Sequence, residues 1–167
     1  MNKAAFEELY MQQLPGMFRL AQSILHHTAD AEDAVHQAVL QAWKRIDTIQ
    51  PGKEKAYLAR IVINECHNIQ RMRQRTVPTS VFPERAKTET SFRELRNIIE
   101  QLPEKLRIPF LLVYMEGYSA QEAASVTNTT VFAVKSRLKR ARKSLQIELG
   151  KEEDSDALYT ERPAADV

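Results

Sequence analysis

With 167 residues, of which 43% are hydrophobic and 28% charged, the chain can form one medium-sized domain or two small ones of ordinary composition. Its single cysteine, Cys66, excludes an internal disulfide framework, and the sequence has neither a long apolar run nor a signal-like N-terminus, so we expect a cytoplasmic protein without stable membrane insertion. The net charge of +2 is uneven: residues 151–167 hold six acids and two bases, so residues 1–150 carry +6, which favours a polyanion as partner.

Helical periodicity dominates the N-terminal half, and no segment shows the alternation of a β-strand. A first helix is expected at about residues 6–25, with a kink or a new helix start at Pro15. A second helix is expected at about residues 28–46, and Thr28 or Asp30 can cap it. The side of the second helix that we expect to be buried comprises Ala31, Val35, Ala38, Val39, Ala42, Trp43 and Ile46.

Residues 47–55 break the helical pattern and are expected to form a loop. A third helix is then expected to run to about residue 75 and to end in three arginines, where cations suit the helix dipole. Its inward residues are predicted to be Leu58, Ile61, Val62, Ile69 and Met72.

The composition changes in the middle of the chain, where residues 76–91 contain two prolines and six Ser or Thr with hardly any apolar periodicity. This composition predicts a flexible interdomain linker. Helical patterning then resumes, with Pro109 expected to bend its helix or to mark a later start. Residues 150–167 are expected to form an acidic, disordered tail. The predicted fold class is all-α, with two small helical domains at residues 1–75 and 92–149.

A short capped helix precedes the most basic stretch of the chain. Ser119 and Glu122 match the S-x-x-E capping box, so a helix of about two turns is expected to begin there. Asn128 tolerates the left-handed backbone of a tight turn, and Thr129 or Thr130 can cap the next helix. The order of short helix, tight turn and long basic helix is typical of a helix-turn-helix, whose second helix reads the major groove of DNA.

The helix expected after this turn carries six Lys or Arg and no acid up to Leu145. Its predicted buried side comprises Val131, Val134, Leu138, Ala141 and Leu145. Its opposite side comprises Phe132, Lys135, Ser136, Lys139, Arg140 and Lys143. Lysine and arginine can reach guanine edges or phosphates, so we predict that this side enters DNA. Arg137 and Arg142 lie towards the flanks, where phosphate contacts or pairs within the protein are expected.

Other interpretations of this basic helix are a solvated charged face, a membrane-surface helix and a segment bound by a calmodulin-like partner. The missing acids and the capped helix upstream favour DNA over a merely solvated face. Valine, alanine and leucine on the apolar side suit packing on protein, which argues against the other two. A metal enzyme that uses Cys66 and the histidines is disfavoured, because no second His or Cys lies four residues from His67. We therefore expect no metal site.

Both halves of the chain resemble the extracytoplasmic-function (ECF) sigma factors, a two-domain group in the sigma-70 family of bacterial RNA polymerase. ADAEDAVHQAVLQAWKRI is similar to the family's core-polymerase-binding helix, and YLARIVINECHNIQRMRQR is similar to its promoter helix. LPEKLRIPFLLVYMEGYSAQEAASVTNTTVFAVKSRLKRAR is similar to its C-terminal domain, most specifically in EGYSAQEAA and VKSRLKRAR. The resemblance spans about residues 5–147.

The resemblance implies a specificity subunit of RNA polymerase that has no catalytic centre and no cofactor. Residues 1–75 are then expected to bind core RNA polymerase and the minus-10 promoter element, and residues 92–149 the minus-35 element as duplex DNA. An anti-sigma factor is a frequent further partner in this family. The chain is therefore expected to direct promoter-specific transcription initiation.

Three sets of site residues follow from the resemblance and from the charge pattern. The predicted minus-35 set comprises Thr130, Phe132, Lys135, Ser136, Arg137, Lys139, Arg140 and Lys143. The predicted minus-10 set comprises Lys53, Lys55, Arg60, Asn64, Arg71, Arg73 and Arg75. The predicted polymerase-binding set comprises Asp30, Glu32, Asp33, Gln37 and Gln41. The acids of this last set also serve simple helix capping, and residues 47–55 also fit an ordinary connector.

The nearest alternative is a two-domain helix-turn-helix regulator that binds operator DNA without joining polymerase. The acidic second helix and the basic end of the third argue against it, since a simple repressor needs no second basic helix. The acidic tail raises a further hypothesis, that residues 151–167 fold back on the basic helix and weaken DNA binding. A solvated tail is the simpler interpretation.

Overall fold

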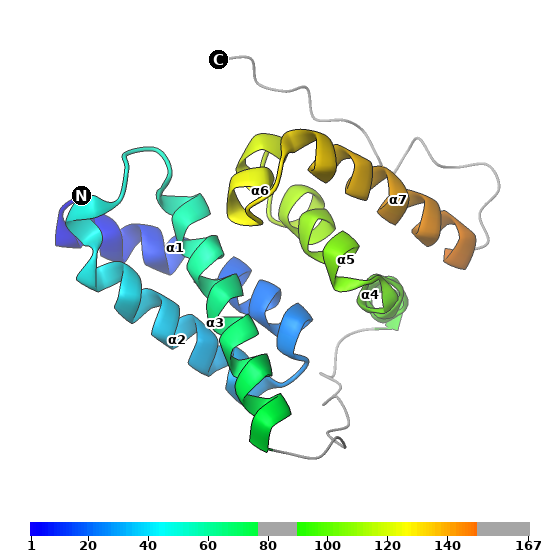
Figure 1. Ribbon diagram of the computed structural model, residues 1–167, viewed down its shortest axis with the longest axis horizontal. Helices are drawn as coiled ribbons and strands as arrows, with labels where there is room; N and C mark the ends of the chain where they lie inside the picture. Colours follow the sequence, from blue (N-terminus) through cyan, green and yellow to red (C-terminus); the bar gives the residue numbers. More distant parts are fainter. Residues whose placement is uncertain (77–89, 150–167) are drawn as a thin grey trace. The chain divides into compact units, whose positions relative to one another are not determined.

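The computed structural model describes residues 1–76 and 90–149, and every regular element within these ranges is helical (Figure 1). The chain divides into two compact units, of which the first contains α1, α2 and α3 and the second contains α4, α5 and α7. The expected all-α fold class is confirmed, whereas the predicted tail and most of the predicted linker lie outside the described residues. The elements are α1 (Lys3–Leu25), α2 (Thr28–Lys44), η1 (Ile46–Thr48), α3 (Glu54–Thr76), α4 (Thr90–Gln101), α5 (Glu104–Phe110), η2 (Leu111–Met115), α6 (Ala120–Val126) and α7 (Val131–Leu149).

In the first unit, α1, α2 and α3 each pack against the other two. The inner side of α2 is made of four alanines with no exposed surface, namely Ala31, Ala34, Ala38 and Ala42. Because an alanine projects only a methyl group, α1 and α3 can lie close to the α2 backbone. The larger core side chains come from α1 and α3 and include Phe6, Leu20, Ile24, Leu58, Ile61 and Val62.

α1 continues as one helix through Pro15, so the new helix start expected there is wrong. Phe6 before the proline and Met17 after it are both buried in the core, and this packing outweighs the hydrogen bond that proline cannot make. α1 ends at Leu25, and His26 takes the left-handed conformation with a φ of 53°. Gln70 of α3 donates to the carbonyl of Ile24 at 3.1 Å and so satisfies one terminal acceptor.

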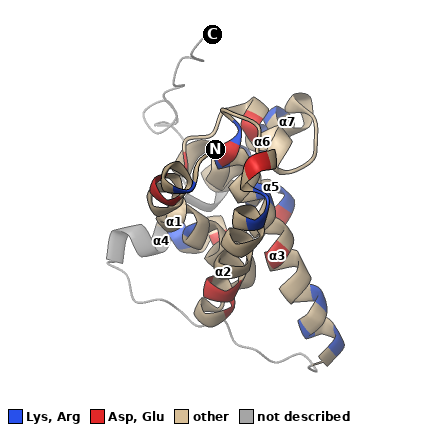
Figure 2. Ribbon diagram, turned by 90° about the vertical axis from the view of Figure 1, so that its left-hand side faces the viewer, with Lys and Arg blue, Asp and Glu red and all other residues tan. Residues whose placement is uncertain are grey.

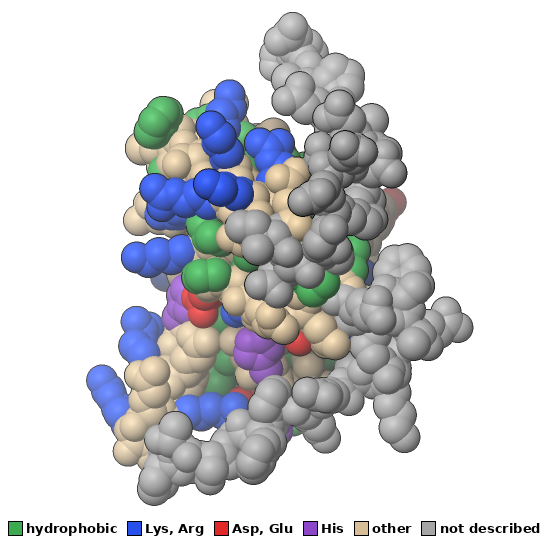
Figure 3. Space-filling model, turned by 90° about the vertical axis from the view of Figure 1, so that its right-hand side faces the viewer, with side chains coloured by type: hydrophobic (Ala, Val, Ile, Leu, Met, Phe, Trp, Pro, Cys, Tyr) green, Lys and Arg blue, Asp and Glu red, His purple; other side chains and the backbone are tan. Residues whose placement is uncertain are grey.

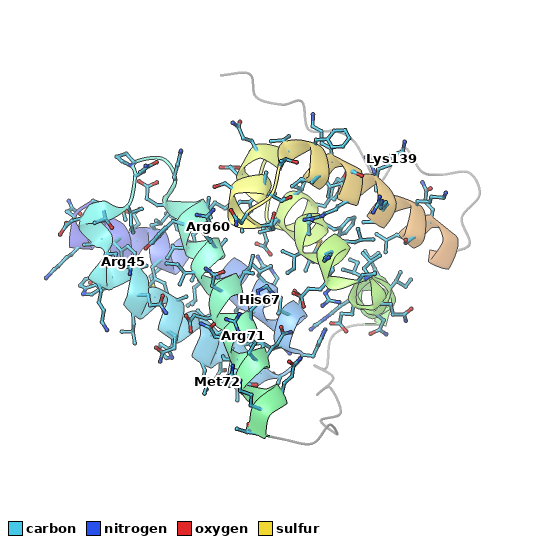
Figure 4. The ribbon with its side chains drawn as sticks, in the orientation of Figure 1. Arg45, Arg60, His67, Arg71, Met72 and Lys139 are labelled. Carbon is cyan, nitrogen blue, oxygen red and sulfur yellow. The ribbon has the colours of Figure 1, made fainter. Side chains whose placement is uncertain are left out.

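Two local expectations in the first unit are wrong. α2 is capped by His27, whose Nδ1 accepts from the backbone N–H of Asp30 at 3.4 Å, and not by the side chain of Thr28 or Asp30. Met72 was expected to face inward, but its side chain is 66% exposed. The last turns of α3, where Met72 lies, extend beyond α1 and α2, so no described helix of this unit covers its side chain (Figures 1 and 4).

In the second unit, α4 and α5 pack against α7, and a buried arginine joins the first two helices. Arg107 is only 6% exposed, and its Nη1 donates to the carbonyls of Glu100 and Leu102, both at 2.9 Å. These bonds satisfy acceptors that the end of α4 would otherwise leave open. Burial lowers the pKa of Arg107 from its usual value, and Glu104 partly offsets this effect.

Pro109 lies inside α5, which passes directly into the π-helical turn η2. The later helix start expected at Pro109 is therefore wrong. A proline offers no N–H to the preceding turn, and the change of hydrogen-bonding pattern directly after it keeps the chain helical.

Candidate nucleic-acid and partner interfaces

The turn between α6 and α7 has the geometry of a helix-turn-helix. Ser119 Oγ accepts from the N–H of Glu122 at 3.1 Å, and the Glu122 carboxylate accepts from the N–H of Ser119 at 2.8 Å. Asn128 is left-handed, with a φ of 52°. Thr130 Oγ1 then accepts from the N–H of Ala133 at 3.1 Å at the start of α7. The capping box, the turn and the cap expected from the sequence are confirmed.

α7 buries one side within its unit. The buried residues are Val134, Leu138, Ala141 and Leu145. Val131, which was predicted on the same side, is 36% exposed because it is the first residue of α7 and precedes the turns that pack against α4 and α5. The predicted buried side is thus correct in four positions and wrong in this one.

A second stripe runs along α7, and each of its residues precedes a buried one by two positions in the sequence. We call it the outward stripe. It comprises Phe132, Ser136, Lys139 and Lys143. Two residues correspond to about 200° around an α-helix, so this stripe faces almost directly away from the core. Lys139 and Lys143 are exposed, and Phe132 has 82% of its surface exposed. Figure 4 labels Lys139 on α7, and Figure 3 shows basic side chains standing out from the surface.

The other predicted minus-35 residues surround the outward stripe or lie nearer the core. Lys135 and Arg140 are exposed on its two flanks, whereas Arg137 is half-buried. Arg142 donates from Nη1 to the Tyr114 hydroxyl at 3.2 Å, so it forms the pair within the protein that was one expectation for it. The described part of α7 thus presents an outer surface of Lys, Arg, Ser and Phe without an acid among residues 131–146.

The basic residues of α3 lie on two different sides of the helix. Arg60, Asn64, Arg71 and Arg75 are separated by four, seven and four residues, so they form one stripe, and all four are exposed. Arg73 lies on the other side and forms an ion pair with the carboxylate of Asp30 at the start of α2. Figure 2 shows the basic residues at the end of α3. The predicted minus-10 set therefore combines exposed side chains with the half-buried Arg73, which pairs with Asp30.

His67 lies on the same side of α3 as this stripe, three residues after Asn64 and four before Arg71 (Figure 4). It is half-buried and was not among the predicted site residues. Its spacing from Asn64 and Arg71 is the sequence signal that groups it with them.

The loop between α2 and α3 is anchored by two buried isoleucines, Ile46 and Ile49, which are 8% and 6% exposed. Between these anchors and α3, the backbone turns at Gly52 with a φ of 80°, a conformation that favours glycine. Lys53 is exposed and Lys55 is half-buried. The loop therefore offers an exposed polar tip on a fixed base.

The outer side of α2 carries most of the predicted polymerase-binding set. Glu32, Asp33, Gln37 and Gln41 are exposed, whereas Asp30 is half-buried and paired with Arg73. Leu40, which was not predicted, is 51% exposed. It lies opposite the four buried alanines of α2, in the middle of the outer side. Its spacing from the alanines places it on the opposite side of α2, and this spacing is the sequence signal that could have identified it.

A chain of polar contacts connects the outer side of α2 with the basic stripe of α3. Gln41 Nε2 donates to Glu65 Oε1 at 2.6 Å, and Asn68 donates to the same oxygen at 3.2 Å. Arg71 in turn donates to the Asn68 amide oxygen. Gln41 and Arg71, which belong to two different predicted sets, are thus connected through Glu65 and Asn68.

Within residues 1–76 and 90–149, no three His, Cys, Asp or Glu side chains are grouped so that they could hold a metal ion. None of the helices described is both long enough and apolar enough to cross a membrane.

The family comparisons match both units. Residues 9–76 match the model for Sigma-70 region 2, and residues 92–145 match the model for Sigma-70, region 4. These matches cover α2 and α3, and the helix-turn-helix of α6 and α7 up to residue 145.

Curated relatives and solved structures agree with this result. The chain is 30% identical to the ECF RNA polymerase sigma factor EcfG of Rhodopseudomonas palustris, over 79% of this chain and 78% of the relative. It is also 30% identical to the ECF RNA polymerase sigma factor SigM of Mycobacterium tuberculosis, over 89% and 79%. The sigma factor RpoE of Bartonella quintana, solved in complex with the anti-sigma factor NepR, is similar with a TM-score of 0.76 and 26% identity, over 89% of this chain and 98% of that one. The chain therefore belongs to the ECF sigma factors of the sigma-70 family.

Proposed function

We propose that the chain binds core RNA polymerase and directs it to promoters, with the first unit recognising the minus-10 element and the second the minus-35 element. The observation that carries this proposal is the presence of two outward basic helical stripes, one on α3 and one on α7, each on its own unit. A regulator with a single reading helix has no use for the first of them.

For the minus-35 element, the proposed reading surface is the outward stripe of α7 with its flanks Lys135 and Arg140. The N-terminal part of a recognition helix contacts base edges, and later turns contact the DNA backbone. Lys135, Ser136, Lys139 and Arg140 are therefore proposed as base or phosphate contacts in the groove, and Lys143 as a phosphate contact. Thr130 is proposed to act chiefly as the cap that sets the start of α7.

For the minus-10 element, the proposed surface is the stripe of Arg60, Asn64, Arg71 and Arg75 together with the tip of the loop before α3. Exposed arginines along one helix side suit contacts to successive phosphates. The anchored loop suits an extruded base, because a pocket for such a base needs polar groups held on a fixed frame. Lys53 and Lys55 are proposed to contact the backbone of the strand that is held there.

For core polymerase, the proposed surface is the outer side of α2, where Glu32, Asp33, Gln37 and Gln41 surround the exposed Leu40. An exposed leucine within a polar rim matches the usual anatomy of a protein interface. Asp30 is proposed to act indirectly, because its carboxylate already pairs with Arg73. The chain is proposed to supply no catalytic group and to act where the polymerase acts, in the cytoplasm.

An anti-sigma factor is included among the proposed partners. The sigma factor RpoE of Bartonella quintana was solved in complex with such a protein, NepR. An inhibitor that covers the outer side of α2 would block the polymerase surface proposed above.

The proposal is tested by run-off transcription with core RNA polymerase over fragmented genomic DNA of the source bacterium, with core polymerase alone as the control. We expect transcripts that start only when the chain is present, at promoters that share two spaced sequence elements. Tight binding of the chain to DNA without any initiation would contradict the proposal and indicate an operator-binding regulator instead.

A further inference from the structure

The most exposed large apolar side chain among the described residues is Phe132, with 82% of its surface open to solvent. It is the second residue of α7 and the first member of the outward stripe, four residues before Ser136 and seven before Lys139. An exposed phenyl ring at this position makes no contribution to the core of its unit. A partner that covers the outward stripe would therefore cover Phe132 as well.

The charge of the surroundings indicates which kind of partner covers it. The described side chains of α7 outside its buried stripe include six bases and no acid, so the partner surface is expected to be anionic, as duplex DNA is. The first turns of a recognition helix lie closest to the base edges, whereas phosphates lie to its sides. On a recognition helix bound in this way, Phe132 would lie at the depth of the bases and not of the backbone.

The chemistry of the major groove then narrows the contact to one group. Adenine, guanine and cytosine present only hydrogen-bond donors and acceptors there, which a phenyl ring cannot satisfy. Thymine presents a 5-methyl group, the one apolar surface on a base edge. We propose that Phe132 recognises a thymine of the minus-35 element through this methyl group. The inference rests on the proposed function and adds a specificity-determining residue to it.

The test replaces each thymine of the minus-35 element, on either strand and one at a time, with deoxyuridine, which lacks only the 5-methyl group. Initiation is measured by run-off transcription with subsaturating holoenzyme on the promoter that the genomic experiment supplies. With the wild-type chain, one position is expected to lose about fourfold in initiation, the effect of removing one buried methyl group. With Phe132→Ala, initiation from this promoter is expected to be equally slow whether that position holds thymine or deoxyuridine.

Three matched variants make the result specific. Phe132→Leu keeps an apolar side chain and is expected to retain most of the preference for thymine. Val131→Ala changes the neighbouring exposed apolar residue and is expected to retain all of it. Lys139→Ala is expected to weaken every template alike and to leave the ratio between thymine and deoxyuridine unchanged. Thermal unfolding checks that each variant folds.

The inference is overturned if no position distinguishes thymine from deoxyuridine, or if Phe132→Ala shows the same ratio as the wild type. If the chain directs initiation normally but gives either of these two results, only this role of Phe132 is rejected, and the proposed function stands. A chain that never directs initiation rejects the proposed function, and the role of Phe132 is rejected with it.

Discussion

Arg73 and its neighbours Arg71 and Arg75 illustrate how similar residues take different tasks within five positions. Arg73 pairs with Asp30 at the start of α2, with the two side chains 33% and 18% exposed. Arg71 and Arg75 lie on the exposed side of α3. The sequence shows three arginines at a helix end and cannot show which one has an acid opposite it, because that depends on how α2 and α3 pack. Of the three arginines, Arg73 therefore has a structural role, because it joins α3 to α2.

This division predicts different defects for two similar substitutions. Arg73→Ala should lower the free energy of unfolding by about 1 kcal/mol, because it removes a half-buried ion pair and leaves Asp30 without its partner. Arg71→Ala should leave stability nearly unchanged and should reduce the salt dependence of promoter binding by about one phosphate contact. Urea unfolding and promoter binding at several salt concentrations measure both effects. Equal loss of stability in the two variants would contradict the assignment.

At the scale of elements, the helix-turn-helix was predictable because its determinants are local. A capping box spans four residues, and a left-handed turn residue is recognisable by its type. Most of the predictions that failed depend on neighbours, namely the new helix starts at Pro15 and Pro109 and the burial of Met72 and Val131, whereas the cap of α2 at His27 is a local feature that was missed. Periodicity identifies the side of a helix that can be buried, but it does not show where the covering helix ends.

The turn before α7 allows a direct test at this scale. Asn128 has a φ of 52°, where glycine is unstrained and a β-branched residue is not. Asn128→Gly should keep the free energy of unfolding within about 1 kcal/mol of the wild type, whereas Asn128→Val should lower it by about 1 to 2 kcal/mol. Thermal unfolding followed by circular dichroism measures the difference. Stability in the valine variant equal to that of the glycine variant would show that the turn is not left-handed in solution.

At the scale of the whole molecule, the proposed function combines two DNA-reading surfaces with one surface for polymerase. The family was evident from sequence segments in both halves, and most of the proposed site residues are exposed, as a binding role requires. Leu40 was missed because the predicted sets were chosen by charge and polarity, and His67 was missed because its spacing from Asn64 and Arg71 was not used. An interface also needs apolar surface, which a search for charged residues overlooks.

The separation of these surfaces predicts that polymerase binding can be removed without unfolding the chain. Leu40→Glu should weaken binding to core polymerase at least about tenfold, since a leucine buried in an interface contributes roughly 1.5 to 3 kcal/mol. Met11→Glu on α1 is the matched control, because Met11 is also exposed, at 63%. Fluorescence anisotropy with labelled core polymerase measures both. Equal affinity of the two variants would exclude Leu40 from the polymerase surface.

The two stripes of α7 also bear on how this protein can change over generations. The residues that hold α7 in its unit and those that face away from it do not overlap, so the outward positions can be substituted one by one without a compensating change in the core. An inserted or deleted residue within α7 would instead turn every later side chain by about 100° and disturb both stripes together. If these four outward positions read DNA as proposed, point substitutions at them allow duplicated copies of such a chain to acquire new target sequences, whereas a change of length in this helix does not.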